Sequence, residues 1–320
     1  MRVLERDARR PGPTPLDHDV PRALVGPTAS GKTDAGMELA RRAGAEILVV
    51  DSMTVYRGME VGTAKPALER REGIPHHLLD LADPAEPFSV ARFKAAAREV
   101  LRDLRRKGTP ALLVGGSGLY YRAVVDDLRF PGTDPSVRRA LEAEASAGET
   151  RLHARLRTFD PQAAAKIDPS NTRRTVRALE VAAITGRRFS SFARAWKRYP
   201  SGGVRAAGVM LSPEVLRLRI EARARRMLDG SLIDEVRRLR DRGFGRFLTS
   251  SQAIGYLEVS LHLQGRLSSE EVLEAIVRRT RNLARRQMAW FRRDPRVRWF
   301  PVGPGGAMEA VEEIEGYLWG

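Results

Sequence analysis

Residues 26–33 read Gly26-Pro27-Thr28-Ala29-Ser30-Gly31-Lys32-Thr33 and fit the phosphate-binding pattern G-x-x-x-x-G-K-[ST]. The glycines let the backbone wrap a phosphate closely, Lys32 supplies a mobile cation, and Thr33 offers a hydroxyl to Mg²⁺. Residues 23–25 are typical of the end of a buried strand, and residues 37–40 continue as a helix whose N-terminus favours anions. The stretch therefore predicts a P-loop, but it leaves open whether the phosphate belongs to a nucleotide or to another substrate.

Composition limits the classes of protein. The 320 residues suffice for one large or two moderate domains, and no apolar run approaches the roughly 20 residues that span a bilayer. The chain has no cysteine, which excludes disulfides and thiolate zinc sites. Residues 1–20 mix many arginines with acidic residues and prolines, so we expect a disordered leader and not a secretory or transit signal.

The net charge is +16, and most of the 56 basic residues are arginine. This charge indicates either a polyanionic partner or a solvated surface that is simply rich in arginine. Because the basic residues cluster along the chain and arginine suits phosphate and base contacts, the sequence favours a nucleic-acid partner.

Further strands are predicted after the P-loop. Residues 46–50 are a short apolar run that ends at Asp51, and residues 110–114 are another that runs into Gly115-Gly116-Ser117. Between them, residues 89–108 have helical periodicity, with Ser89 as N-cap and Gly108 as the stop. Alternation of strands and helices predicts a P-loop NTPase-like parallel sheet covered by helices, with Asp51 at the strand end where ligands bind. Gly36, inside the first helix, indicates close packing there.

Residues 132–200 contain helix-start and helix-stop signals but no strand candidate. We therefore expect an all-helical insertion domain at 132–200, within an α/β core made of residues 21–131 and 201–320. In the second part of the core, we expect strands at 206–211 and 297–300 and helices from 213, from about 269 to 293, and at 307–318.

The chain resembles the tRNA dimethylallyltransferases, also called tRNA isopentenyltransferases, along most of residues 22–300. Seven segments carry the resemblance: the P-loop, Asp51 to Met59, Gly62-Thr63-Ala64-Lys65-Pro66, Gly115 to Tyr120, Arg177 to Glu180, Gln252 to Tyr256, and Thr280 to Gln287. The P-loop is shared with many nucleotide enzymes, whereas the Asp51 segment followed by Gly-Thr-Ala-Lys-Pro is far narrower.

The resemblance implies transfer of a dimethylallyl group from dimethylallyl diphosphate to N6 of the adenosine just 3′ of the tRNA anticodon. Residues 26–33 (Gly26, Pro27, Thr28, Ala29, Ser30, Gly31, Lys32 and Thr33) would hold the donor diphosphate, with Mg²⁺ on Thr33 and no ATP consumed. Asp51, Ser117 and Lys32 are the implied catalytic residues, Ser117 standing where the family usually has Thr. Asp51 is the candidate base for the N6 amine, the alternative being an indirect Mg²⁺ ligand. Arg223 either binds the donor diphosphate or is an exposed helix charge.

The resemblance also implies RNA contacts. The expected tRNA-binding residues are Asp51, Ser52, Met53, Thr54, Ser117, Arg138, Arg173, Arg174, Arg177, Gln252, Ala253, Ile254, Gly255 and Tyr256. The basic helix at 278–293 either follows RNA phosphates or is a solvated face with Trp290 packed inward. We expect Asp34, directly after the P-loop, to point away from the bound diphosphate. Without the cysteines of a C-terminal zinc finger, the chain is expected to be a bacterial-type cytoplasmic enzyme, monomeric and without a membrane partner.

Two other functions remain alternatives. A P-loop kinase of a nucleoside or small metabolite would share the P-loop, Asp51 and a helical insertion, but the strand before Gly115-Gly116-Ser117 carries no aspartate of the Walker-B type. An RNA-binding ATP switch or chaperone would need neither Asp51 nor an apolar channel.

Overall fold

The computed structural model describes residues 20–126, 128, 130–146, 149–192, 198–200, 202–244 and 249–320. The expected leader up to residue 19 and the helix stop at Gly148 lie outside these ranges. The chain forms two compact units, one made of the residues up to Tyr121 and from Ser201 on, the other of Arg122–Pro200.

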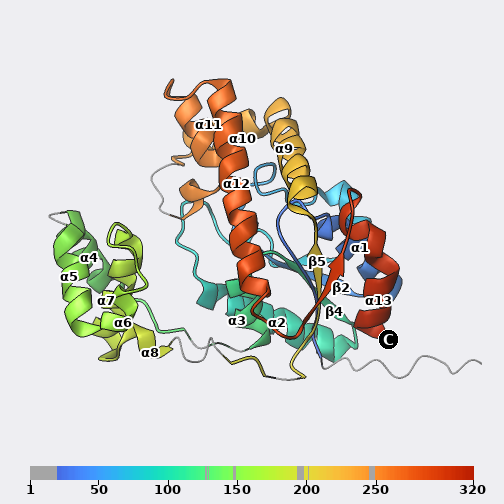
Figure 1. Cartoon of the computed structure of the whole chain (residues 1–320), viewed down its shortest axis with the longest axis horizontal. Helices are drawn as coiled ribbons and strands as arrows, with labels where there is room; N and C mark the ends of the chain where they lie inside the picture. Colours follow the sequence, from blue (N-terminus) through green and yellow to red (C-terminus); the bar gives the residue numbers. More distant parts are fainter. Residues whose placement is uncertain are drawn as a thin grey trace, which may run out of the picture. The chain divides into compact units, whose positions relative to one another are not determined.

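The first unit is built on a parallel sheet of six strands (Figure 1). The strands are β1 (Arg22–Val25), β2 (Glu46–Val50), β3 (His76–His77), β4 (Ala111–Gly115), β5 (Arg205–Met210) and β6 (Val297–Pro301). Their order is β3-β2-β4-β1-β5-β6, and every neighbouring pair is parallel. The predicted P-loop fold is therefore confirmed, whereas the two-residue strand β3 was not predicted.

Register brings the ends of three strands together. Val25 of β1 pairs with Gly115 of β4, and Gly115 in turn pairs with Val50 of β2. The P-loop, Asp51 and Ser117 follow these strand ends, so all three emerge at the carboxyl edge of the sheet, where α/β folds bind ligands.

Eight helices of the described chain begin in this unit. They are α1 (Lys32–Ala43), α2 (Val90–Lys107), α3 (Gly118–Val125), α9 (Pro213–Asp229), α10 (Leu232–Asp241), α11 (Tyr256–His262), α12 (Ser269–Phe291) and α13 (Val311–Trp319), with 3₁₀ turns at Leu68–Arg71, Ser250–Gln252 and Gly306–Ala310. The predicted ends of α2 are confirmed, because the Ser89 hydroxyl accepts a hydrogen bond from the Arg92 N–H at 3.2 Å and Gly108 has φ 67°.

Helices α1 and α13 lie side by side and pack on the sheet (Figure 1). Leu39 and Ile314 are fully buried there against Leu24 and Val209 of the strands. The packing predicted at Gly36 is confirmed, because a Cβ at this position would lie 2.8 Å from a methyl group of Val114.

The second unit consists of helices among its described residues. They are α4 (Pro135–Ser146), α5 (Glu149–Phe159), α6 (Pro161–Ala164), α7 (Thr172–Thr185) and α8 (Phe189–Phe192). Asn171 caps α7 by accepting a hydrogen bond from the Arg174 N–H, and Gly186 ends the helix with φ 65°. Leu141, Leu156 and Leu179 belong to its small separate core.

In the described part of the chain, no helix is both long enough and apolar enough to cross a membrane.

Candidate active site

The P-loop joins β1 to α1, and three of its residues have positive φ angles. Gly26, Ala29 and Gly31 have φ of 155°, 63° and 82°. Ala29 is the only one of the three with a side chain, and such backbone strain is typical of functional turns. Gly31 caps α1 without a side-chain hydrogen bond, so the first N–H groups of the helix remain available to an anion.

Two cations converge on the P-loop. The Lys32 ammonium donates a 2.9 Å hydrogen bond to the Pro27 carbonyl, and Arg223 Nη1 donates a 3.1 Å hydrogen bond to the Thr28 hydroxyl. Burial, reinforced by Arg223, lowers the pKa of Lys32 to about 8, although the Asp51 carboxylate opposes the shift. Burial also lowers the pKa of Arg223. The loop therefore holds two partly desolvated cations, an arrangement that an anion would stabilise.

Distant side chains hold the P-loop in place. Gln287 Oε1 of α12 accepts a 2.8 Å hydrogen bond from the Thr28 N–H, and Arg219 Nε of α9 donates a 2.8 Å hydrogen bond to the Ala29 carbonyl. Neither residue was predicted as part of the site. The P-loop pattern itself carries no signal for either, because both contacts cross more than 150 residues.

A cavity of about 490 Å³ opens beside the P-loop. It brings together twelve of the predicted residues: Thr28, Lys32, Thr33, Asp51, Ser52, Met53, Thr54, Ser117, Arg223, Gln252, Ala253 and Ile254. Asp51 Oδ1 accepts a 2.7 Å hydrogen bond from the Met53 N–H, which turns the chain just after β2. The buried Thr54 hydroxyl has no hydrogen-bond partner among the described residues.

The remaining predicted residues lie elsewhere. Gly26, Pro27, Ala29, Ser30 and Gly31 shape the P-loop but do not line the cavity. Gly255 and Tyr256 are also absent from the lining; Tyr256 is 0% exposed and its hydroxyl donates a 2.5 Å hydrogen bond to Glu235. The Tyr256 side chain is thus inside the protein and presents no surface to RNA. Asp34 pairs with Arg70 at 2.7 Å and is not part of the cavity lining, as expected.

Helix α12 supplies one wall of the cavity that was not predicted. Its lining residues are Arg279, Asn282, Leu283, Arg286, Gln287 and Trp290. They recur every three or four positions, so they share one helix face, and this spacing is a signal in the sequence. Arg281 and Arg285 are exposed and Phe291 is buried. The exposed arginines fit a solvated face, whereas RNA binding by this helix stays a prediction.

Apolar side chains line another part of the cavity. Ile47 and Val49 of β2, Val114 of β4, and Ala64 and Pro66 lie in its wall, together with half-buried His76. The cavity therefore combines a cationic loop, a carboxylate and an apolar region, a combination that suits a phosphate ester of an apolar group.

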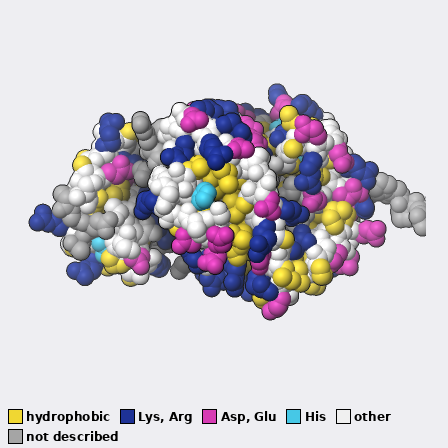
Figure 2. All heavy atoms as spheres, turned by 90° about the horizontal axis from the view of Figure 1, so that it is seen from above, with side chains coloured by type: hydrophobic (Ala, Val, Ile, Leu, Met, Phe, Trp, Pro, Cys, Tyr) yellow, Lys and Arg dark blue, Asp and Glu magenta, His cyan; other side chains and the backbone are white. Residues whose placement is uncertain are grey.

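In the second unit, the four arginines predicted to bind tRNA fall into two pairs. Arg138 and Arg177 each donate a 2.7 Å hydrogen bond to Oε2 of Glu180, whose side chain is 0% exposed, and Arg177 also donates to the Pro131 and Gly132 carbonyls. Arg173 and Arg174 are exposed. Figure 2 shows one face of the protein, where Lys and Arg side chains lie in groups among Asp and Glu side chains.

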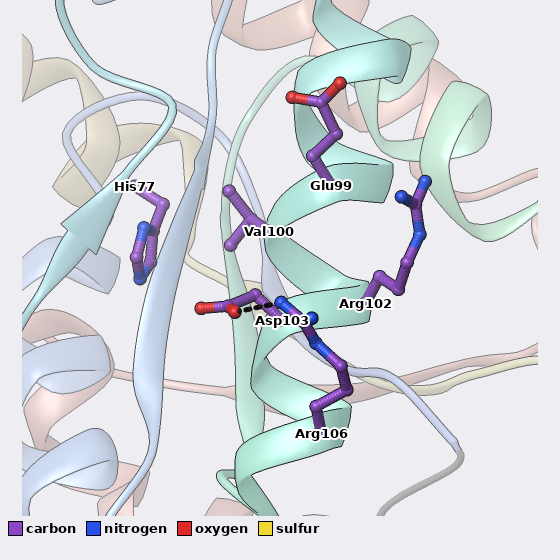
Figure 3. A pocket seen from close by; sticks show the side chains of 6 residues that line it. All are labelled: His77, Glu99, Val100, Arg102, Asp103 and Arg106. Carbon is purple, nitrogen blue, oxygen red and sulfur yellow. Dashed lines mark hydrogen bonds and ion pairs between the residues drawn. The ribbon is translucent and has the colours of Figure 1, made fainter.

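A second cavity, of about 420 Å³, lies beside α2 (Figure 3). It is lined by His77, Glu99, Val100, Arg102, Asp103 and Arg106. Asp103 already pairs with Arg106 and Lys107, and His77 with Glu46. None of the predicted site residues lies there, so the cavity beside the P-loop is the candidate active site.

The fold and this cavity define a P-loop α/β protein whose cavity suits a phosphate-bearing organic substrate. Comparison with known families is more specific. The sequence model described as IPP transferase matches residues 54–294, and the one described as isopentenyl transferase matches residues 20–83. The chain belongs to the IPP transferase family.

Individual relatives support membership in the same family. The tRNA dimethylallyltransferase of Kineococcus radiotolerans is 50% identical, covering 88% of this chain and 91% of the relative, and that of Streptomyces coelicolor is 48% identical, covering 88% and 90%. The solved tRNA isopentenylpyrophosphate transferase of Bacillus halodurans superposes with a TM-score of 0.69 at 38% identity over 93% of this chain and 95% of that one. A eukaryotic dimethylallyltransferase captured acting on tRNA gives a TM-score of 0.72 at 25% identity over 91% and 75%. These comparisons give no support to a P-loop kinase.

Proposed function

We propose that this enzyme transfers a dimethylallyl group from dimethylallyl diphosphate to N6 of the adenosine just 3′ of the tRNA anticodon, releasing diphosphate. One observation carries the proposal: Lys32, Arg223 and Asp51 share a single cavity that also has an apolar wall. The names of the relatives, tRNA dimethylallyltransferases, support the same reaction.

The P-loop binds the donor diphosphate. The N–H groups at the start of α1 and the cations of Lys32 and Arg223 face the position where negative charge develops as the C–O bond breaks, and preorganised donors of this kind lower the barrier. Thr33 lines the cavity and offers a hydroxyl oxygen that suits Mg²⁺. When bound, Mg²⁺ supplies further charge neutralisation to the leaving diphosphate.

Asp51 activates the acceptor. The lone pair of an exocyclic adenine amine is delocalised into the ring, so the amine needs orientation and a proton acceptor. The Asp51 carboxylate accepts a hydrogen bond from N6–H and takes the proton as the C–N bond forms and the C–O bond to diphosphate breaks. Ser117, at the neighbouring strand end, lines the same cavity and offers a hydroxyl to either substrate.

RNA reaches the cavity as an unstacked base. Ser52, Met53, Thr54 and the segment Gln252–Ile254 line the cavity and contact the target nucleotide. Exposed Arg286 of α12, and Arg173 and Arg174 of the second unit, are the cations that bind the RNA backbone. The monomeric state and the cytoplasmic location belong to the same proposal.

Incubation with unmodified tRNA tests the proposal. The enzyme receives Mg²⁺ and either dimethylallyl diphosphate or ATP, and the digested nucleosides are then weighed by mass spectrometry. We expect prenylated adenosine with the prenyl donor alone. A phosphorylated product with ATP would indicate a kinase, and no modified adenosine with either donor would contradict prenyl transfer.

A further inference from the structure

One wall of the candidate active site is a loop to which the proposed reaction assigns no chemical step. Gly62, Thr63, Ala64 and Pro66 line the cavity, but none of them carries a charge or an acid–base group. The loop is irregular, with Ala64 at φ 52°. Its shape therefore depends on what holds it.

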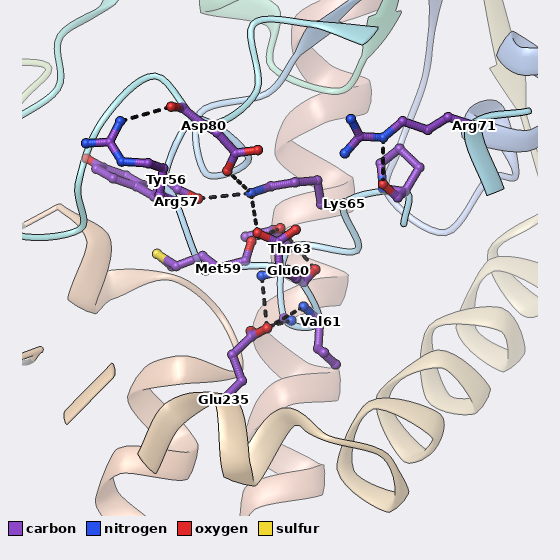
Figure 4. Close-up of polar contacts among 12 residues, drawn as sticks. Tyr56, Arg57, Met59, Glu60, Val61, Thr63, Lys65, Arg71, Asp80 and Glu235 are labelled. Atoms are coloured by element: carbon purple, nitrogen blue, oxygen red, sulfur yellow. Dashed lines mark hydrogen bonds and ion pairs between the residues drawn. The ribbon is translucent and has the colours of Figure 1, made fainter. Parts of the chain in front are cut away.

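Glu235 of α10 holds the loop from one side (Figure 4). Glu235 is 3% exposed as a residue, and its carboxylate accepts hydrogen bonds from the Glu60 and Val61 N–H groups at 3.0 and 2.9 Å, with the Gly62 N–H at 3.4 Å. No Lys or Arg of the described residues pairs with it. A buried carboxylate is costly unless its hydrogen bonds are satisfied, and here consecutive main-chain N–H groups satisfy them. The carboxylate thereby determines the conformation of the loop at 60–62.

Tyr256 of α11 completes this contact. Its hydroxyl donates to the other carboxylate oxygen at 2.5 Å, and its ring packs on Gly62, where a Cβ would lie 2.3 Å from a ring carbon. Burial and the Glu235 carboxylate raise the pKa of Tyr256, so the phenol keeps its proton and remains a donor.

Lys65 anchors the other end of the loop. Its side chain is 0% exposed, and its ammonium donates to the Tyr56 carbonyl at 3.0 Å, to Glu60 at 2.9 Å and to Asp80 at 2.6 Å (Figure 4). The loop is thus bound from two sides, while Gly62, Thr63, Ala64 and Pro66 line the cavity.

We propose that Glu235, acting through Tyr256 and the N–H groups of Glu60 and Val61, is a positioning residue that keeps the 60–66 loop in place as the wall against which the two substrates are aligned. The inference rests on the proposed function of the cavity. It also gives Tyr256 a role in place of a direct RNA contact.

Substitutions of Glu235 and Tyr256 test the proposal in the full chain. Glu235→Ala removes the acceptor, Tyr256→Phe removes only the hydroxyl, and Glu235→Gln keeps one acceptor oxygen for the two N–H groups. The matched control is Asp234→Ala, because Asp234 is the neighbouring acid on α10, is 59% exposed and pairs only with Arg237 among the described residues.

We expect kcat of Glu235→Ala to fall by about ten-fold or more, since small misplacements of reacting groups are costly, and that of Tyr256→Phe to fall by a smaller factor. The Kd values for tRNA and inorganic diphosphate should stay within about two-fold, because other elements bind both. Glu235→Gln should recover most of kcat, and Asp234→Ala should match the parent. Hydrogen exchange of residues 59–66 should be faster than in the parent in Glu235→Ala and in Tyr256→Phe, but not in the other two variants.

Unchanged kcat and exchange in both variants would overturn the proposal, as would equal losses in Glu235→Gln and Glu235→Ala. If Glu235→Ala does not fold, Tyr256→Phe decides. The exchange measurement needs no turnover, so it tests whether Glu235 and Tyr256 hold the loop independently of the proposed prenyl transfer. Faster loop exchange in a protein that prenylates no tRNA would contradict the proposed function, while still showing that Glu235 and Tyr256 hold the loop.

Discussion

The side-chain oxygen of Gln287 lies 2.8 Å from the main-chain nitrogen of Thr28, although 259 positions separate the two residues in the sequence. Gln287 is 8% exposed, and its amide also occupies the space that a side chain at position 116 would need. One residue of α12 therefore contacts both the P-loop and the loop that follows β4, the two segments that frame the proposed diphosphate site.

Gln287→Ala should weaken donor binding. Without its acceptor, the Thr28 N–H loses a partner and the P-loop must be ordered by the ligand itself. We expect KM for dimethylallyl diphosphate to rise roughly ten-fold, equivalent to about 1.4 kcal/mol. Steady-state kinetics at saturating tRNA measure this effect, with exposed Gln264→Ala as the control. An unchanged KM would show that the contact does not support the loop.

Donor affinity should depend on the charge of Lys32. Its pKa of about 8 is set by burial and by Arg223. Because a diphosphate binds the protonated amine, affinity is fully present below this pKa and is lost as the pH rises through it, by up to about ten-fold per pH unit. Kd for dimethylallyl diphosphate from pH 6.5 to 9.5 checks this expectation. Lys32→Arg stays protonated throughout, so the same decline in that variant would assign the titration to another group.

Asp51→Ala should separate chemistry from RNA binding. Loss of a general base typically costs about 10²–10⁴-fold in kcat, whereas the Kd for tRNA should change little. Single-turnover kinetics and filter binding measure the two effects. Asp34→Ala removes a carboxylate next to the P-loop but outside the cavity lining and should leave kcat unchanged. Loss of tRNA binding with normal turnover would instead make Asp51 an RNA contact.

The arginines of the second unit should divide into two functions. We propose that exposed Arg173 and Arg174 contact RNA phosphates. The double substitution to Ala should then weaken tRNA binding and reduce the slope of log K against log salt by about 1–2. Arg177→Ala should instead lower the free energy of unfolding by about 1–3 kcal/mol, because it removes donors from Glu180 and from two carbonyls. Denaturant titration measures the stability role of Arg177, and salt-dependent tRNA binding measures the RNA-binding role of Arg173 and Arg174. A salt slope that changes only in Arg177→Ala would reverse the assignment.

Two glycines should respond oppositely to alanine. Gly36→Ala places a methyl group 2.8 Å from Val114 and should destabilise the protein by about 1–3 kcal/mol. Gly316, inside α13, has nothing within 4 Å of its Cβ position, so Gly316→Ala should stabilise by about 0.5–1 kcal/mol. Thermal unfolding measures both changes, and equal effects of one sign would contradict this packing argument.

Much of the site could be predicted because its parts are local. The P-loop pattern needs eight consecutive residues, and Asp51 directly follows a strand that its own apolar run reveals. Parallel strands then bring these segments to one edge of the sheet without further information. The face of α12 that lines the cavity also has a periodic signal, although the predicted site did not include it.

The segment 252–256 marks the limit of such reasoning. Gln252, Ala253 and Ile254 line the cavity, whereas Tyr256, two positions further, is buried against Glu235. Adjacent residues of one motif thus serve the cavity and the core, and no pattern within the motif separates them.

The sequence by itself determined the parallel α/β fold, the P-loop pattern with Asp51 at the next strand end, and helices in the described part of residues 132–200, because backbone preference, hydrophobic period and capping act over a few residues. Only the tertiary structure decided that Gln287 supports the P-loop, that Glu235 and Tyr256 hold the 60–66 loop, and that Arg138 and Arg177 bind Glu180. Those contacts join residues far apart in the chain, and the packing of whole helices on the sheet determines which of the many possible polar pairs meet.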